Sequence, residues 1–155
     1  MASAYVTGLR MLARRELCEA QVRTRLARRQ FDAGEIEEAI ARLVRERALD
    51  DRRTALACAR TEALVRHHGR RRALRQIETL GIDRDLARTA VAEVFEDLDE
   101  DDLIAQALSR RLRHDSLAEA TAVRRVHRYL LAQGFDPARV HAALRTRVTH
   151  TIHDD

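Results

Sequence analysis

Apolar residues recur along most of the chain at intervals of three and four, the spacing that places them on one face of an α-helix. In three places an apolar residue directly precedes an Asp, and an apolar stripe with helical spacing follows. These pairs, about fifty residues apart, are Phe31-Asp32, Ile82-Asp83 and Phe135-Asp136. The stripes share apolar residues at the fourth, seventh and eighth positions after the Asp. The pattern predicts a helix beginning at each Asp and a threefold internal repeat.

The residues around each Asp are typical of one helix ending and the next beginning. An Asp side chain at the N-cap accepts hydrogen bonds from the free N–H groups of the first turn. Gly81 and Gly134 stand where the preceding helix would end in a left-handed conformation. Gln30 occupies the same place in the first copy, so we expect this cap to be strained or built differently.

Extending the pattern outward from each Asp predicts three helices per copy. The predicted helices lie near 4–14, 18–29, 33–47, 51–67, 70–80, 83–97, 101–113, 117–133 and 137–148. They divide the chain into repeats at 1–49, 50–98 and 99–149, with a frayed tail at 150–155. A lone triplet of helices cannot bury all its apolar faces. We therefore expect an all-α fold of three tandem three-helix repeats, stacked into an elongated, curved solenoid-like array.

The amino-acid composition supports this fold class and restricts the cellular location that we expect. The 155 residues include only five Gly and one Pro, too little turn chemistry for a multi-stranded β fold. No apolar run is long enough to span a membrane, and the N-terminus lacks the pattern of a secretory signal. Cys18 and Cys58 stand alone, without metal-ligand spacing. We expect a cytoplasmic protein with reduced thiols.

The spacing of the candidate metal-binding and catalytic residues does not fit the known motifs. Asp97, Asp99 and Asp101 imitate the start of a calcium-binding EF-hand loop, but Asp102 and Leu108 stand where that loop needs Gly and Glu. The acidic run is therefore interpreted as a solvated face between repeats. The seven His have no zinc-ligand spacing, and no phosphate-binding loop or nucleophile motif is present. The sequence predicts no catalytic residues, no metal site and no cofactor, and we do not expect an enzyme.

Clustered arginines are the remaining chemical signal. All 29 basic residues are Arg, and the segment 66–75 contains no acid. Arg at the start of the helix predicted at 70–80 opposes the helix dipole, which favours a functional reason for the cluster. The alternative is a solvated face in a chain whose coding sequence favours Arg. The candidate contacts to an anionic partner are Arg70, Arg71, Arg72, Arg75, Arg14, Arg15, Arg28 and Arg29.

The scarcity of aromatic residues narrows the class of partner. Proteins dedicated to single-stranded nucleic acid stack bases on exposed aromatic rings. Here Phe31 and Phe135 are assigned to the repeat cores and Phe95 to a helix stripe, which leaves Tyr5 and Tyr129. An assembled anionic partner, contacted over a long surface, fits better than a free single strand.

Several short segments, taken in order, resemble the RecX family, bacterial regulators of the RecA recombinase. The likeness covers residues 4–148. It is carried by Leu12-Ala13-Arg14-Arg15-Glu16 with Leu26, Leu49-Asp50-Asp51 with Ala55, Gly69 with Ile77 and Leu80-Gly81-Ile82, and Tyr129-Leu130 with Gly134-Phe135. The chain departs from the family at Cys18, where a capping Ser is common, at Gln30, where Gly is usual, and at Thr54, where an aromatic residue often stands.

The resemblance implies a protein that lies along the groove of the RecA filament on DNA. There it would modulate, most often inhibit, ATP hydrolysis and recombination, with roles in DNA repair and the SOS response. It implies no catalytic residues, and we expect a monomer that contacts RecA or its DNA through the arginine clusters. One alternative is a nucleic-acid-binding module acting alone through helix-turn-helix-like triplets. A second is a structural adaptor for another acidic protein.

Overall fold

A computed structural model describes residues 2–112, 117 and 119–153, and these residues form nine α-helices, one π-helical segment and no strand. The helices are α1 (Ala4–Leu12), α2 (Glu19–Arg28), α3 (Ala33–Arg45), α4 (Asp51–Arg60), α5 (Arg70–Thr79), α6 (Arg84–Glu96), α7 (Glu100–Leu112), α8 (Ala120–Ala132) and α9 (Pro137–His153). The π-helical segment η1 (Thr61–Val65) continues α4. The predicted all-α class is confirmed.

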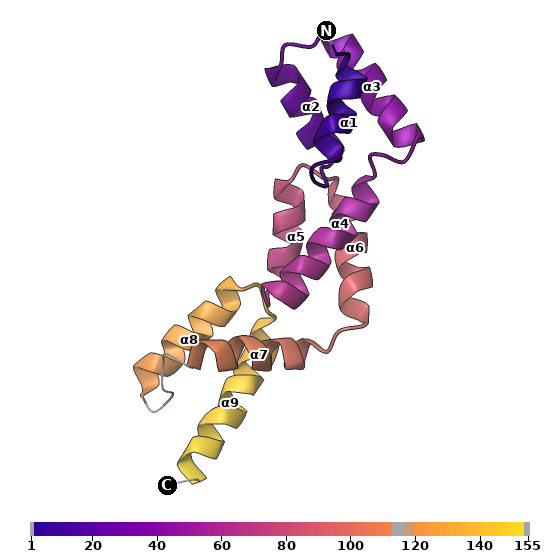
Figure 1. Cartoon of the computed structure of the whole chain (residues 1–155). Helices are drawn as coiled ribbons and strands as arrows, with labels where there is room; N and C mark the ends of the chain where they lie inside the picture. Colours follow the sequence, from indigo (N-terminus) through magenta and orange to yellow (C-terminus); the bar gives the residue numbers. More distant parts are fainter. Residues whose placement is uncertain (1, 113–116, 118, 154–155) are drawn as a thin grey trace.

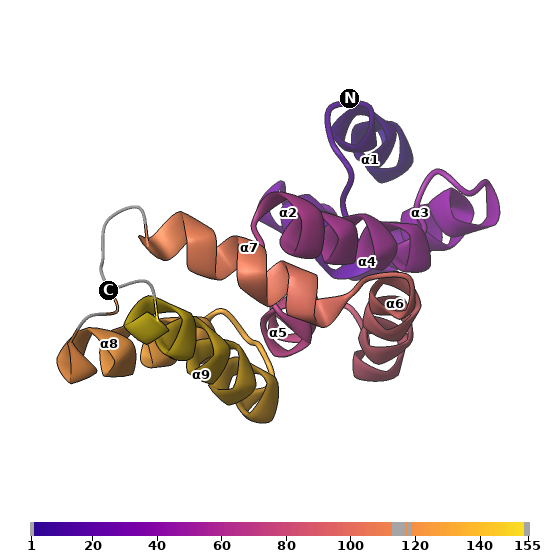
Figure 2. The same ribbon diagram turned by 90° about the horizontal axis from the view of Figure 1, so that it is seen from below.

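The helices pack mainly within three successive groups, α1–α3, α4–α6 with η1, and α7–α9. The groups follow one another along the molecule, with the N-terminus and the C-terminus at opposite ends (Figure 1). Seen from below, α8 and α9 lie to one side of the first two groups, so the array bends (Figure 2). The repeat boundaries at 1–49, 50–98 and 99–149 stay a prediction, compatible with this grouping.

The helix starts predicted at the three Asp residues are present. Asp32 accepts from the backbone N–H of Gly34 at 3.1 Å, and Asp83 accepts from that of Leu86 at 3.2 Å. Asp136 accepts from the backbone N–H of Ala138 at 3.0 Å. Each cap therefore satisfies N–H groups that the first turn leaves free.

The residue that ends the preceding helix is left-handed in all three copies. Gly81 and Gly134 have φ values of 93° and 92°, and Gln30 has a φ of 63°. Gln30 thus adopts the conformation that glycine takes in the other copies, at a cost of roughly 1 kcal/mol for a side chain in that region. Of the two alternatives expected for the first cap, the left-handed Gln30 corresponds to the strained one.

The buried apolar residues form two cores. One lies within the first group and includes Val22, Leu26 and Leu43. The other runs without interruption through the second and third groups, from α4 to α9, and contains Phe95 and Phe135. The last two groups are therefore joined by shared apolar packing, whereas the first group has a core of its own and adds only Cys18 and Ala20 to the second core.

Some predicted details differ in the structure. Phe31, expected in the core, is only half-buried, because the chain turns at Gln30 and leaves the ring at the edge of the first group. The helix expected at 51–67 is split, with its last part wound as η1. The final helix continues past Val148 to His153. Fraying of 150–155 stays a prediction, and the segments 113–116 and 118 lie outside the described residues.

Candidate anion-binding surfaces

Three of the predicted arginines, Arg14, Arg15 and Arg29, line one open cleft in the first helix group. The cleft has a volume of about 930 Å³. Its other lining residues are Ala2, Ser3, Thr7, Arg10, Met11, Arg25, Gln30, Phe31 and Glu35. The structure thus brings together arginines from the end of α1 and the end of α2, which are separated in the sequence.

One wall of the cleft follows α1 and the turn after it. Ser3, Thr7 and Arg10 are spaced three or four residues apart, so they share one side of the helix, and Arg14 follows in the turn after it. Ser3 caps α1 by accepting from the backbone N–H of Val6. After the helix, the backbone N–H of Arg14 donates to the carbonyl oxygen of Met11 at 3.1 Å. This turn keeps Arg14 on the wall that begins at Ser3.

The opposite wall is formed where α2 ends and α3 begins. Arg25 and Arg29 are four residues apart on α2 and its C-cap, and the left-handed Gln30 turns the chain toward Phe31. Cations at a helix C-terminus are favoured by the helix dipole, which stabilises Arg25 and Arg29 locally. Arg28 is exposed at the same helix end but does not line the cleft.

The cleft carries a strong excess of positive charge. Its lining includes five arginines, Arg10, Arg14, Arg15, Arg25 and Arg29, but only one acid, Glu35. Within the described part of the chain, none of the five forms an ion pair with an Asp or Glu. Their guanidinium donors are thus available to an anionic ligand.

The arginines at the start of α5 are in a different situation, because they contact the third helix group or the turn leading to it. The guanidinium of Arg70 lies over the ring of Phe95, 5.3 Å from its centre, and donates to the carbonyl oxygen of Phe95 at 3.3 Å. It is also 3.6 Å from a carboxylate oxygen of Glu100. Arg70 therefore connects α5 to the end of α6 and the start of α7.

Arg71 and Arg72 reach the end of α8 and the start of α9. Arg72 donates to the side-chain oxygen of Gln133 at 3.1 Å and to the carbonyl oxygen of Ala132 at 3.4 Å. Arg71 lies 3.9 Å from a carboxylate oxygen of Asp136. These acceptors offset the unfavourable position of cations at a helix N-terminus. Arg75 is exposed, and it forms no ion pair with any acid that the structure describes.

Two glycines bring the backbones of the second and third helix groups into direct contact. We call this contact between α4–α6 and α7–α9 the second joint. The backbone N–H of Gly69 donates to the carbonyl oxygen of Gln133 at 2.7 Å, and that of Arg71 donates to Gly134 at 3.2 Å. A Cβ atom on Gly69 would lie 2.4 Å from the carbonyl oxygen of Gly134. A Cβ atom on Gly134 would lie equally close to the backbone nitrogen of Arg72. Only glycine fits at both positions.

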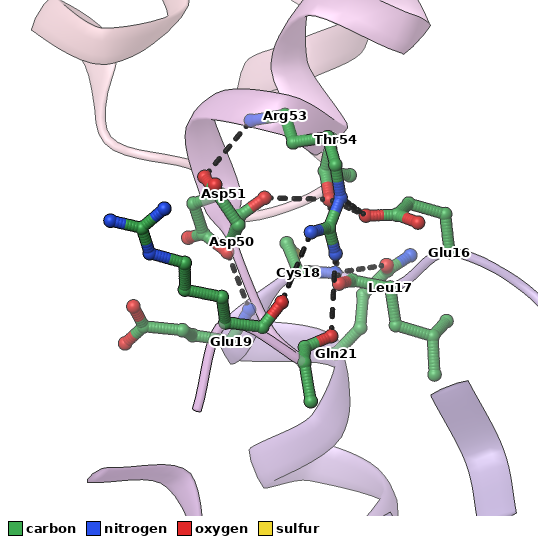
Figure 3. A network of polar contacts seen from close by, with 11 residues as sticks. Glu16, Leu17, Cys18, Glu19, Gln21, Asp50, Asp51, Arg53 and Thr54 are labelled. Atoms are coloured by element: carbon green, nitrogen blue, oxygen red, sulfur yellow. Dashed lines mark hydrogen bonds and ion pairs between the residues drawn. The ribbon is translucent and has the colours of Figure 1, made fainter. Parts of the chain in front are cut away.

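The first joint, between α1–α3 and α4–α6, contains a network of polar contacts (Figure 3). Arg53 donates to Glu16 at 2.8 Å and to the carbonyl oxygens of Arg47 and Ala48. The hydroxyl of Thr54 lies 3.1 Å from the same Glu16 oxygen. Arg53 thereby satisfies carbonyl groups just beyond the end of α3, and Glu16 ties the start of α2 to α4.

A second set of contacts at this joint surrounds the start of α2. The backbone N–H of Glu19 donates to a carboxylate oxygen of Asp51 at 2.8 Å, and the Cys18 thiol donates to the carbonyl oxygen of Leu80 at 3.0 Å. Burial raises the pKa of Asp51 and of Cys18 above their ordinary values. Cys18 is thus a fully buried residue of the first joint.

Glu62 in η1 is a buried carboxylate that the sequence did not single out. One of its oxygens accepts from Arg66 at 3.0 Å, and the other lies 2.5 Å from Nδ1 of His68. The backbone N–H of His68 also donates to the carbonyl oxygen of Glu62 at 2.8 Å. These contacts stabilise the turn that leads into Gly69 and the second joint.

The acidic run before α7 also has structural partners. Asp99 accepts from the backbone N–H of Asp101, and Asp101 pairs with Arg139 of α9 at 2.9 Å. The run therefore caps α7 and holds α9, in addition to facing solvent. In the described ranges no three His, Cys, Asp or Glu side chains are grouped so that they could hold a metal ion. None of the described helices is long and apolar enough to cross a membrane.

Residues 4–43 match a family model described as the first three-helix domain of RecX. The chain is 30% identical, over 98% of its length, to the regulatory protein RecX of Geobacillus kaustophilus. The chain is thus similar to RecX proteins along nearly its whole length. It spans 56% of the length of the Geobacillus protein. It is also 29% identical to regulatory protein RecX of Syntrophotalea carbinolica, covering 87% of this chain and 90% of that protein.

Solved RecX structures share the fold. The crystal structure of RecX from Lactobacillus salivarius has a TM-score of 0.77 at 20% identity and covers 92% of this chain and 93% of that chain. A second RecX crystal structure has a TM-score of 0.78 at 18% identity, and the match covers 92% of this chain and 70% of the chain in that structure. The all-α array described above is therefore the RecX fold.

Two arginines of the cleft, Arg10 and Arg25, were not among the contacts predicted from the sequence. A usable signal was present, because Arg10 precedes Arg14 by four residues and Arg25 precedes Arg29 by four. That spacing predicts that each pair shares one side of its helix. What the sequence did not provide is the way α1 and α2 pack, which makes the two pairs face one cleft.

Proposed function

We propose that this chain is a non-enzymatic regulator that binds the RecA filament on DNA and inhibits its ATPase and recombination activity. The observation that carries the proposal is the match to regulatory RecX proteins over nearly the whole chain, in an elongated array with the same fold. An array of this kind offers a long, continuous surface for a helical partner.

The distribution of charge supports this mode of binding. The open arginine cleft lies in the first group, and further exposed arginines follow along the array, among them Arg28 and Arg75. The DNA held by such a filament carries one negative charge on each phosphate. We propose Arg14, Arg15, Arg28, Arg29 and Arg75 as direct contacts, whereas Arg70, Arg71 and Arg72 act mainly by holding the second joint.

Inhibition follows if the bound array favours one geometry of the filament. A ligand shifts a conformational equilibrium only by its difference in affinity for the two states. A protein that spans neighbouring RecA subunits would bind the spacing of one state better than that of another. The regulator would then slow ATP hydrolysis by stabilising that state, without a catalytic group of its own.

The test is addition of the chain to preformed RecA filaments on DNA while ATP hydrolysis is followed. The hydrolysis rate should fall with added protein and level off as the filament saturates. An unchanged rate at a concentration equal to that of RecA would contradict the proposal. Duplex binding in the absence of RecA, measured in parallel, separates it from the stand-alone module, which requires tight, sequence-specific binding.

A further inference from the structure

We propose that the arginine cleft of the first group is a binding site for a run of closely spaced phosphate groups. Such a run is carried by a nucleic-acid backbone or by an inorganic polyphosphate. The inference rests on the proposed function and deepens it, because it assigns to this cleft the phosphate-bearing part of the partner. It concerns a definite set of residues, Arg10, Arg14, Arg15, Arg25 and Arg29, on two facing walls.

The charge balance of the cleft favours a ligand with several negative charges. Five guanidinium groups share the lining with a single carboxylate, that of Glu35, and form no ion pair with acids in the described ranges. A single carboxylate or a lone phosphate would leave most of this charge uncompensated. A polyanion would neutralise several of the arginines at once and release the counterions bound to it.

The arrangement of donors suits an extended ligand. Along α1 the lining residues run from Ser3 through Thr7 to Arg10, and Arg14 follows in the turn after the helix. At a rise of 1.5 Å per residue the part from Ser3 to Arg10 is roughly 10 Å long. That is the axial length of about three stacked nucleotides of one strand. The hydroxyls of Ser3 and Thr7 extend the row of arginines with groups that can donate to phosphate oxygens.

Phosphate fits the cleft better than an acidic peptide does. Binding of a peptide normally depends on large apolar or aromatic side chains that fill buried pockets. The larger apolar residues here are Met11, which is 8% exposed, and the half-buried Phe31. Guanidinium groups bind phosphate oxygens in bidentate fashion without any apolar anchor. The lining therefore favours recognition of a backbone over recognition of bases or peptide side chains.

The experiment measures binding by the full chain without RecA, using inorganic tripolyphosphate and a short labelled oligothymidylate as probes. The test variant is Arg14→Ala/Arg15→Ala, and the matched control is Arg45→Ala/Arg60→Ala. Arg45 and Arg60 are also exposed and lie outside the cleft, so both variants lose two positive charges from the surface. A second test variant, Arg29→Ala, removes a cation from the opposite wall.

We expect the test variant to bind both probes at least about tenfold more weakly than the control. For the oligothymidylate, the slope of log affinity against log salt should shrink by roughly 1.4, the contribution of two single-strand contacts. If the test variant binds only the oligothymidylate more weakly, the result supports the site and identifies a nucleic-acid backbone as the source of the phosphates. If the test variant binds only tripolyphosphate more weakly, the result supports the site and identifies a free polyphosphate as the ligand.

Equal affinity of the test and control variants for both probes would overturn the inference. Binding of a polyglutamate peptide as tightly as the phosphate probes, with the same loss in the Arg14→Ala/Arg15→Ala variant, would overturn the assignment to phosphate. Because RecA is absent, the result is independent of the filament assay. A chain that binds phosphate in the cleft but leaves RecA hydrolysis unchanged would refute the proposed function and leave the site standing.

Discussion

Two arginine-rich regions of this protein carry similar charge in very different surroundings. In the first group, Arg14 and Arg15 line an open cleft whose arginines form no ion pair with the acids described in the structure. In the second group, Arg70 and Arg72 donate to carbonyl oxygens at the ends of α6 and α8. The donors of the first set face the open cleft, and the second set uses its donors to join two parts of the chain.

The comparison shows that a count of positive charges does not identify a binding site. The segment 66–75 is the more strongly charged in sequence, yet Arg70, Arg71 and Arg72 face acceptors from the neighbouring helices. Charge at a helix N-terminus, which first suggested a function, is explained by these acceptors. The acceptors available to each guanidinium are what separate the two regions.

The largest expected effect is at the glycine contact of the second joint. Gly69→Ala should destabilise the protein by about 3 kcal/mol, because the added Cβ overlaps the backbone of Gly134. The φ of Gly69 is −81°, which alanine adopts readily, so the effect would be steric. Urea unfolding measures it, with Gly34→Ala as the control, since the nearest atom there is 3.6 Å away. Equal stability of the two variants would show that the joint is not tightly packed.

A smaller effect is expected for the arginines themselves. Arg72→Ala should lower the free energy of unfolding by about 1 kcal/mol, because it removes the hydrogen bonds to Ala132 and Gln133. Arg75→Ala, three residues further along the same helix, should change the free energy of unfolding by less than about 0.5 kcal/mol. Chemical denaturation of both variants provides the measurement. If Arg75→Ala proves the more damaging, the structural role assigned to Arg72 is wrong.

The sequence predicted the helices and their caps because those depend on neighbouring residues. Asp32, Asp83 and Asp136 cap helices locally, and the left-handed residue at Gln30 follows from its alignment with the two glycines. The roles of the arginines depend on contacts distant in sequence. Nothing near Arg72 indicates that its acceptors lie at the end of α8, and nothing near Arg14 indicates that Arg25 faces the same cleft.

The smallest effect concerns the polar first joint and its response to pH. Burial raises the pKa of Asp51, so in the folded protein the charged form is disfavoured. This group's contribution to stability is therefore greatest at low pH and falls as pH rises from its unfolded pKa through its raised folded pKa. Asp51→Asn keeps an oxygen that can accept from Glu19 and should stabilise the protein by a few tenths of a kcal/mol at neutral pH.

Unfolding of both proteins between neutral pH and about pH 3 checks this sign. The advantage of the Asp51→Asn variant should disappear toward the acid end, where the wild-type carboxyl is protonated in both states. A variant that is less stable at neutral pH, with a deficit that closes on acidification, would mean that the charged carboxylate stabilises the joint.

The most direct test of the distinction between the two regions is RecA ATPase inhibition by Arg14→Glu/Arg15→Glu, measured with its unfolding curve. Both side chains are exposed and lie outside the joints, so the unfolding midpoint should stay within error of wild type. If the cleft faces the filament, about tenfold more of the variant should be needed for the same inhibition. Undiminished inhibition by this stably folded variant would contradict the assignment of the cleft to the partner.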